Sequence, residues 1–324
     1  MLVRHAPILA AALMLAACGG ATPSSPSLPP VQSGAFERGL KEPVLIALDD
    51  NSGRLEYWPL RSSGSDRPKF LSAKLGVSRA AGMVGNGDVV SIASASPAEL
   101  LTYDIDAKTA TAVVDPFGAP VDVAIDANAT RYVLDSAGVT VFTDGSTQPY
   151  QLTCSLLAFG EAIAVDNEGD VFVNGYAPGQ GETAEVVEFP FGSSQCTKVS
   201  IRQEKAYVTG VGIDPNTDDL IIVDNVGCAG GEVGTMLVYG KPYRSKIVSR
   251  GHLRGNCPQQ FRLDATATHF LFRDNEPELP RGHRSRVCRT TCITERLYPG
   301  LREPAIYTGG DIGGFTTIPN RLPN

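Results

Sequence analysis

A short apolar run that ends in one small polar residue occurs six times in this chain of 324 residues. A repeat of about 40 to 50 residues that holds several short strands is typical of one blade of a β-propeller. Successive copies lie 45, 41, 39, 50 and 50 residues apart, and they end at Asp49, Ser94, Asp135, Asn174, Asp224 and Asp274. The spacing therefore predicts an all-β chain folded as a single six-bladed β-propeller.

The two ends of the repeat region predict how the ring closes. The first blade begins at residues 44–50, which match the second strand of the other blades, so it lacks an innermost strand. The segment 313–319 has no blade of its own and matches an innermost strand. We expect this last strand to complete the first blade, because the pairing removes two exposed strand edges.

Aspartates also recur directly after the innermost strands of four blades, at Asp126, Asp166, Asp214 and Asp264. Each precedes Asn, Gly, Pro or Thr residues, and an Asp side chain in such a turn accepts hydrogen bonds from the backbone two residues on. A calcium loop would need alternating ligands that end in a Glu, and the sequence has no such set. We expect turns here, and we predict no metal and no cofactor.

Two segments of this pattern, EAIAVDNEGDVFVNGY (161–176) and TGVGIDPNTDDLIIVDN (209–225), resemble the NHL and YVTN-type repeat propellers. The resemblance covers about residues 42–320 and is strongest in the third to fifth blades. It implies the propeller fold. The family includes binding scaffolds, sensors and some enzymes, so the fold alone does not assign a function.

Some six-bladed relatives are metal-dependent hydrolases of the gluconolactonase and paraoxonase type, with a calcium ion at the mouth of the central channel. A Ca²⁺ site needs six to eight oxygen ligands. Only Glu161 supplies a carboxylate among the residues that we expect to line this mouth, which are Ala80, Val121, Glu161, Thr209, Gln259 and Gly313. We therefore expect Glu161 to be a polar rim residue and a candidate binding residue. We expect no catalysis, and the hydrolase stays open as the alternative.

No nucleophile elbow of the G-x-S-x-G type and no H-E-x-x-H zinc motif occurs. His269 opens an apolar strand, so we expect it to pack in the core. The polar residues that end the six repeated phrases have two interpretations. They could form a rim that binds a cation or a sugar, or each could cap the start of its own loop, which the fold-wide recurrence favours.

The N-terminus predicts export. Residues 1–17 have a basic start and a short apolar stretch, as a cleaved signal peptide has. Leu15-Ala16-Ala17-Cys18 resembles a bacterial lipobox, which implies that Cys18 becomes the lipid-bearing first residue of the mature protein. Gly19, where enterobacterial sorting uses Asp for the inner membrane, implies the outer membrane. A plain secretory signal with an incidental cysteine is the alternative. We expect residues 18–38 to be a Pro- and Ser-rich tether and residues 39–324 to form the propeller.

Six further cysteines remain, an even number that permits disulfides in an exported protein. A zinc site is the disfavoured alternative, since Cys288 and Cys292 have no second pair at metal-ligand spacing. Cys228 and Cys257 lie in loops that leave one face of the ring, so we expect Cys228–Cys257. A Cys288–Cys292 bridge would be local. Cys154–Cys196 follows by elimination, although the two residues are expected at opposite ends of their blades.

Charge is distributed unevenly. Residues 241–302 contain 13 Lys and Arg and 5 Asp and Glu, a net charge of +8, so the rest of the chain, with −7 overall, carries −15. The densest basic part is an insertion in the sixth blade with Arg281, Arg284, Arg286 and Arg289. Such a cluster can attract anionic glycans or lipid headgroups, or it can be a solvated loop paired with Glu276 and Glu278. The sequence thus predicts a lipid-anchored envelope module that binds or scaffolds a protein or an acidic glycan or lipid, and no nucleic acid.

Overall fold

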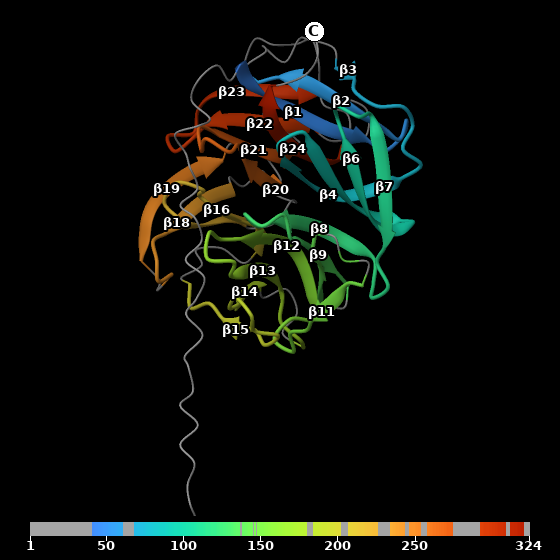
Figure 1. Ribbon diagram of the computed structural model, residues 1–324. Coiled ribbons are helices and arrows are strands. Elements are labelled where there is room, and N and C mark those ends of the chain that lie inside the picture. The colour runs from blue at the N-terminus through green and yellow to red at the C-terminus, as the bar shows by residue number, and fades with distance from the viewer. Residues whose placement is uncertain are drawn as a thin grey trace, which may run out of the picture. The chain divides into compact units, whose positions relative to one another are not determined.

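The computed structural model describes residues 41–320 except for 61–67, 137, 145, 147, 180–183, 202–206, 226–233, 244–245, 254–257, 275–291 and 309–311. In this part of the chain, the strands β1 to β24 form six four-stranded antiparallel sheets. The sheets are the blades of one propeller, so the predicted fold is confirmed. In Figure 1 the strands β8, β12, β16 and β20 surround the centre of the ring, while β7, β15 and β19 lie at its periphery.

The strand bounds, from the centre of each blade outward, are as follows. Blade 1 contains β24 (Ile312–Asn320), β1 (Lys41–Asp49), β2 (Arg54–Pro59) and β3 (Lys69–Phe70). Blade 2 contains β4 (Ser78–Asn86), β5 (Val89–Ser96), β6 (Ala98–Asp104) and β7 (Thr109–Val114). Blade 3 contains β8 (Pro120–Ile125), β9 (Arg131–Asp135), β10 (Gly138–Phe142) and β11 (Tyr150–Leu152).

Blade 4 contains β12 (Phe159–Val165), β13 (Val171–Tyr176), β14 (Ala184–Phe189) and β15 (Thr197–Lys198). Blade 5 contains β16 (Tyr207–Ile213), β17 (Leu220–Asn225), β18 (Gly234–Tyr239) and β19 (Ile247–Leu253). Blade 6 contains β20 (Pro258–Leu263), β21 (His269–Asp274), β22 (Cys292–Leu297) and β23 (Arg302–Thr308).

The ring closes as the ends of the repeat predict. β1 lies between β24 and β2, so the last strand of the chain is the innermost strand of the first blade. Ala47 of β1 is paired with Phe315 on one side and with Glu56 on the other. The closing strand therefore pairs along β1, with two register shifts, and covers the inner edge that β1 would otherwise expose.

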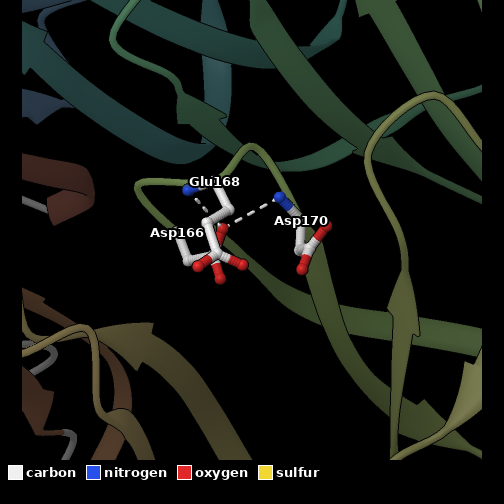
Figure 2. A group of neighbouring side chains, drawn as sticks. All are labelled: Asp166, Glu168 and Asp170. Carbon is white, nitrogen blue, oxygen red and sulfur yellow. Dashed lines mark hydrogen bonds between the residues drawn. The ribbon is translucent and has the colours of Figure 1, made fainter. Parts of the chain in front are cut away.

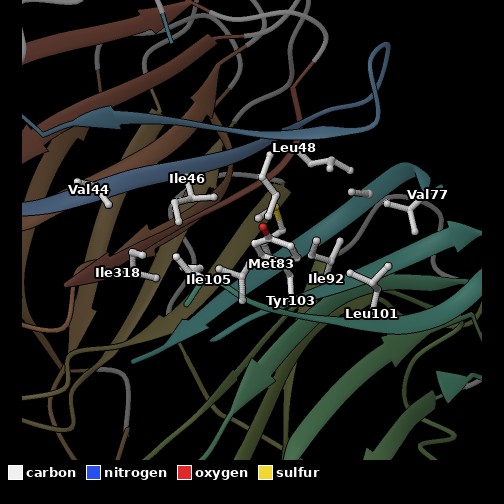
Figure 3. Packing of buried hydrophobic residues seen from close by; sticks show 13 residues of the cluster. Val44, Ile46, Leu48, Val77, Met83, Ile92, Leu101, Tyr103, Ile105 and Ile318 are labelled. Carbon is white, nitrogen blue, oxygen red and sulfur yellow. The ribbon is translucent and has the colours of Figure 1, made fainter. Parts of the chain in front are cut away.

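The core lies between the blades, because both faces of each sheet carry buried apolar side chains. Between blades 1 and 2, Ile46, Leu48, Met83, Ile92 and Ile318 are at most 3% exposed and pack together (Figure 3). Burial of one such side chain contributes about 1.5–3 kcal/mol. Strands such as β13 and β18 are buried on both faces, so each blade packs against both of its neighbours.

A register shift recurs near the start of the innermost strand. The shifts lie between Ala80 and Gly82, Pro120 and Asp122, Gly160 and Ala162, Val208 and Gly210, and Gln259 and Phe261. An extra residue at each shift changes which side chains face the channel, since side chains alternate along a regular strand. We call the end of the ring where the innermost strands start the upper rim, and the opposite end the lower rim. Among the described residues, no helix could span a membrane.

Candidate functional site

The carboxylate that reaches the centre of the ring belongs to Asp122 of β8. Its side chain is fully buried. Its Oδ1 accepts the backbone N–H of Val123 at 2.8 Å, and its Oδ2 accepts the N–H of Ile163 in blade 4 at 3.2 Å. A Cβ on Gly82 would lie 2.0 Å from Asp122 Oδ1, so glycine at this position of blade 2 makes room for the carboxylate.

Two side chains from blade 6 cross the channel to Asp122. The Arg262 guanidinium forms an ion pair with Asp122 Oδ1 and also donates to the Met83 carbonyl at 2.9 Å. Gln260 Nε2 donates to the Ala81 carbonyl at 2.6 Å and approaches Asp122 Oδ1 at 3.3 Å. Both oxygens of the carboxylate thus have partners. This network ties blade 6 to blades 2 and 3.

Sequence reasoning missed this network. The strand pattern predicts Val121 at the channel mouth of blade 3, but the register shift between Pro120 and Asp122 brings the next side chain, Asp122, into the channel. Asp122 accepts hydrogen bonds from Arg262, Gln260 and two backbone N–H groups, so it would have to give up partners to bind a calcium ion. Asp122 as it stands is therefore not arranged as a ligand of the calcium centre of the alternative hydrolase.

Glu161, the candidate binding residue at the channel mouth, lies on β12 at the register shift of blade 4. Its carboxylate accepts the Tyr176 hydroxyl at 3.1 Å and lies 3.4 Å from Asn174 Nδ2. Burial raises the pKa of Glu161, and these two hydrogen bonds oppose the rise. The side chain is partly buried and held by its own blade, which leaves its proposed binding role as a prediction.

The polar residues that end the second strands do not all have the same role. Asp49 Oδ1 accepts the N–H of Asn51 at 3.0 Å, and Asp135 Oδ1 accepts the N–H of Gly138 at 3.0 Å, so these two cap their own turns as expected. Asn174 differs, since its Nδ2 donates to the Val208 carbonyl of the next blade at 2.8 Å. Capping is therefore only part of the account. The side chain of Asp274 lies outside the described residues.

Asp135 also belongs to a buried acid pair between blades 2 and 3. The Thr140 hydroxyl lies 2.7 Å from Asp135 Oδ2 and 3.1 Å from Asp115 Oδ1. One hydroxyl has one hydrogen, so it donates to only one of the two carboxylates at a time. Burial raises the pKa of Asp115, the N–H of Phe117 opposes the rise, and the charge of Asp135 adds to it. The N–H of Phe117 thus donates to Asp115, a carboxyl group whose pKa lies above its ordinary value.

The aspartates of the lower rim form turns, as predicted. Asp126 Oδ1 accepts the N–H groups of Asn128 and Thr130, both at 2.8 Å. Asp264 Oδ1 accepts the N–H of Thr268 at 2.8 Å, and Asp214 Oδ1 accepts the N–H of Asn216 at 2.9 Å. These contacts use the carboxylates to close the hairpin turns.

In blade 4 the same turn brings Asp166, Glu168 and Asp170 together (Figure 2). Asp166 Oδ1 accepts the N–H groups of Glu168 and Asp170, both at 2.9 Å. Asp166 Oδ2 has no hydrogen bond of good geometry but lies 3.1 Å from Lys241 Nζ. Lys241 Nζ is also 3.2 Å from Glu168 and 2.6 Å from Asp218.

Lys241 is therefore the cation that balances this cluster. Burial alone would lower the pKa of Lys241, but the nearby carboxylates of Asp218 and Asp166 raise the pKa above its ordinary value. A charged lysine beside Asp166 and Glu168 opposes the approach of a second cation to these two carboxylates.

His269 lies in the core, as predicted. Its side chain is buried, and its Nδ1 is 2.6 Å from Glu295 Oε1. The Tyr307 hydroxyl donates to the other oxygen of Glu295. Tyr307 packs edge-on against Trp58 of blade 1, with ring centroids 6.1 Å apart. This polar group thus belongs to the contact between blade 6 and blade 1.

The upper rim of blades 2 to 4 carries exposed apolar side chains. Phe117 in the β7–β8 link is 39% exposed, and Leu156 and Phe159 beside the start of β12 are 37% and 45% exposed. A cavity of about 50 Å³ lies between blades 3 and 4, and Ser136 and Phe159 are among its lining residues. We call Phe117, Leu156 and Phe159 the apolar rim. The cavity has room only for a few water molecules.

The disulfide Cys154–Cys196 is confirmed, with Cα atoms 5.5 Å apart. An isolated bridge between Thr153 and Gln195 joins the outer parts of blades 3 and 4 beside it. The structure therefore brings together two cysteines that the strand order places at opposite ends of their blades. Cys292 is also disulfide-bonded. Its predicted partner Cys288, the pair Cys228–Cys257 and the arginines Arg281, Arg284, Arg286 and Arg289 lie outside the described residues.

Comparison with known proteins supports the fold and identifies no family. No family model matches the chain, and no curated protein matches it. A chain in the crystal structure of a nidogen–laminin complex superposes with a TM-score of 0.64 at 15% identity, covering 85% of this chain and 97% of that one. Hydrazine synthase from Kuenenia stuttgartiensis superposes with a TM-score of 0.51 at 13% identity, covering 70% of this chain and 64% of that one. At this level of identity, the similarity shows that the chain has a β-propeller fold.

Proposed function

We propose that the protein is a lipid-anchored binding module of the bacterial envelope, and that its apolar rim is the surface that contacts a partner protein. The observation that carries the proposal is the contrast between the polar side chains of the channel and the exposed apolar side chains of the upper rim. The one carboxylate that reaches the channel from β8, Asp122, is saturated by Arg262 and backbone N–H groups. Phe117, Leu156 and Phe159 are meanwhile exposed to solvent.

The rim has the composition of a protein contact and not of a catalytic site. Aromatic side chains are enriched among the residues that dominate protein–protein binding. Phe117 and Phe159 are held by ordered backbone, because Asp115 Oδ1 accepts the N–H of Phe117 at 3.0 Å and β12 begins at Phe159. An aromatic side chain has only two χ angles, so its burial by a partner costs little side-chain entropy.

The proposed location in the cell is inferred from the N-terminal sequence alone. The lipobox-like segment 15–18 and the Pro- and Ser-rich residues 21–35 support a lipid on Cys18 and an extended tether. Two or more acyl chains hold a protein stably at a membrane surface. The proposed module therefore acts on proteins that share its membrane or the adjoining compartment.

Site-specific photo-crosslinking in the producing cells tests the contact surface. A photoreactive phenylalanine analogue replaces Phe117, Phe159 or, as the control, Phe191, which is 64% exposed at the lower rim. We expect the first two positions to yield the same discrete protein adduct and Phe191 to yield none. Equal adducts from all three positions, or none from the rim, would contradict the proposal.

The anchor has a separate test. In cells given a radiolabelled fatty acid, the parent chain should incorporate label and sediment with membranes. Cys18→Ser should lose both properties, while Cys154→Ser should keep the label. A labelled Cys18→Ser variant would contradict lipid attachment at this residue.

A further inference from the structure

The outermost strand of blade 2 differs from the other outermost strands. All six residues of β7 (Thr109–Val114) are exposed, and none is charged. β3 and β15 have two residues each and contain Lys69 and Lys198. β11 has three residues, while the longer β19 and β23 contain charged or basic side chains, Arg250 and His252 in one, Arg302 and Glu303 in the other.

Short length and charge are the usual ways in which proteins protect an edge strand from pairing with another chain. β7 has neither protection. Val113 and Val114 at its upper end are 40% and 69% exposed. Threonine and valine, four of the six residues of β7, are among the residues that pair best across strands.

The outward-facing backbone groups of β7 follow from its inner pairing. The N–H of Asp115 donates to the Ala98 carbonyl at 3.0 Å, so the Asp115 amide faces β6. Because the direction alternates along an antiparallel strand, the N–H and C=O groups of Ala110, Ala112 and Val114 face away from β6. Among the described residues, β7 pairs with β6 alone. These three residues therefore offer a row of donors and acceptors to the outside.

We propose that β7 pairs edge to edge with β7 of a second copy of this chain, about a two-fold axis at Ala112. In this register Ala112 lies opposite the second copy's Ala112, and Ala110 lies opposite the second copy's Val114. Every outward N–H and C=O of the three residues then has a partner. A register centred on Thr111 would pair only Ala110 with Ala112 and would leave Val114 opposite Lys108, whose φ of 55° takes it out of the strand conformation.

The absence of charge favours a second copy as the occupant. A strand that pairs with itself about a two-fold axis places the residues near the axis close to their own equivalents, so a charge there would face a like charge. β19, with Arg250 and His252, and β3 and β15, with their lysines, would carry that cost. β7 carries none. The two blades would then form one continuous sheet across the two molecules.

Sedimentation velocity over a range of concentrations tests the pairing in the full mature chain. Ala112→Pro removes the central outward N–H without touching a bond to β6, since proline is tolerated where its nitrogen faces outward on an edge strand. Ala112→Thr keeps the N–H and is the matched control. We expect the parent and Ala112→Thr to dimerise, and Ala112→Pro to weaken dimerisation by at least about tenfold.

Cysteine crosslinking keeps the proposal testable if the proline variant does not fold. The proposed register places Thr111 opposite the second copy's Val113. A mixture of Thr111→Cys and Val113→Cys proteins should therefore form a disulfide-linked dimer under mild oxidation, and each variant by itself should form much less. A parent chain that stays monomeric, a dimer that Ala112→Pro leaves intact, or equal crosslinking of each variant alone would overturn the pairing. Protection of β7 only in the presence of a different protein would also overturn it.

Discussion

The centre of the ring and the outer edge of blade 2 differ in whether their polar groups have hydrogen-bond partners. At the centre, Asp122, Arg262 and Gln260 join three blades, and both oxygens of the buried carboxylate have donors. At the edge, six uncharged residues of β7 are exposed, and their outward backbone groups have no partner among the described residues. The difference shows that polar groups at the axis join blades 2, 3 and 6 to one another, while the backbone groups on the outer edge of β7 have no partner strand among the described residues.

The largest effect should come from breaking the central ion pair. Arg262→Met leaves the Asp122 carboxylate buried beside backbone groups but without its cation. Removal of one partner of a buried pair typically lowers the free energy of unfolding by about 3–5 kcal/mol. Urea unfolding followed by circular dichroism measures the loss.

The double variant Asp122→Asn/Arg262→Met is the control for this experiment. It removes both charges, and the amide oxygen can still accept from the N–H of either Val123 or Ile163. We expect it to recover a substantial part of the lost stability. A cost below about 1 kcal/mol for Arg262→Met would mean that the centre is not held by this pair.

The second-largest loss of stability should come from removing the disulfide that joins the outer parts of blades 3 and 4. Cys154–Cys196 closes a loop of 42 residues, and β7 has no comparable covalent tie among the described residues. In the chain-entropy model, replacement of both cysteines by serine lowers the free energy of unfolding by about 4 kcal/mol. The measurement is the urea midpoint under oxidising conditions. If the reductant-treated parent and the double serine variant unfold at the same midpoint as the oxidised parent, the bridge has no stabilising role.

A carboxyl group in blade 1 should make stability depend on pH. Burial, followed by the charge of Asp49, raises the pKa of Glu56 from 4.5 to about 7, and its Oε2 has no hydrogen-bond partner. The folded chain therefore holds a proton that the unfolded chain has released between pH 4.5 and 7. The free energy of unfolding should fall as the pH rises through this range, by on the order of 3 kcal/mol, and then level off.

Thermal unfolding of Glu56→Gln across the same pH range checks this account. The neutral amide has nearly the same shape and cannot ionise, so its stability curve should be flatter than that of the parent. Parallel curves for the two proteins would place the pH dependence elsewhere.

The smallest of these effects should come from one lower-rim turn. Asp126→Ala removes the acceptor of the N–H groups of Asn128 and Thr130 and should cost about 1 kcal/mol. Asp126→Asn keeps the accepting oxygen and should cost less. Equal losses for both variants would show that the charge, and not the turn geometry, matters here.

The sequence predicts most of the frame because the frame is repeated. Apolar phrases at a spacing of 39 to 50 residues define the blades, and the unpaired segment 313–319 predicts β24 and the closure of blade 1. The Asp turns follow from residue types whose local chemistry is known. Each of these features depends on contacts near in the chain or on the recurrence of one pattern.

The Asp122 network at the centre and the exposure of β7 at the edge cannot be predicted from the repeat. Asp122 enters the channel because of a single extra residue at the register shift of β8, and a residue count along the strand does not reveal such a shift. Its partner Arg262 lies 140 residues away in sequence. The exposure of β7 depends on what other chain segments leave uncovered, which no local pattern encodes. The sequence predicts the pairing Cys154–Cys196 only by elimination, since it depends on the contact between the outer parts of blades 3 and 4.

Backbone hydrogen–deuterium exchange of the full mature chain, measured at low and at high protein concentration, tests the contrast between centre and edge most directly. The amides of Val123 and Ile163, which donate to buried Asp122, should exchange slowly and equally at both concentrations. The outward amides of Ala110, Ala112 and Val114 should exchange fast when dilute and at least about tenfold more slowly when concentrated. Rapid exchange at Val123 and Ile163, or β7 amides that are indifferent to concentration, would contradict a ring that is sealed at its centre and open at this edge.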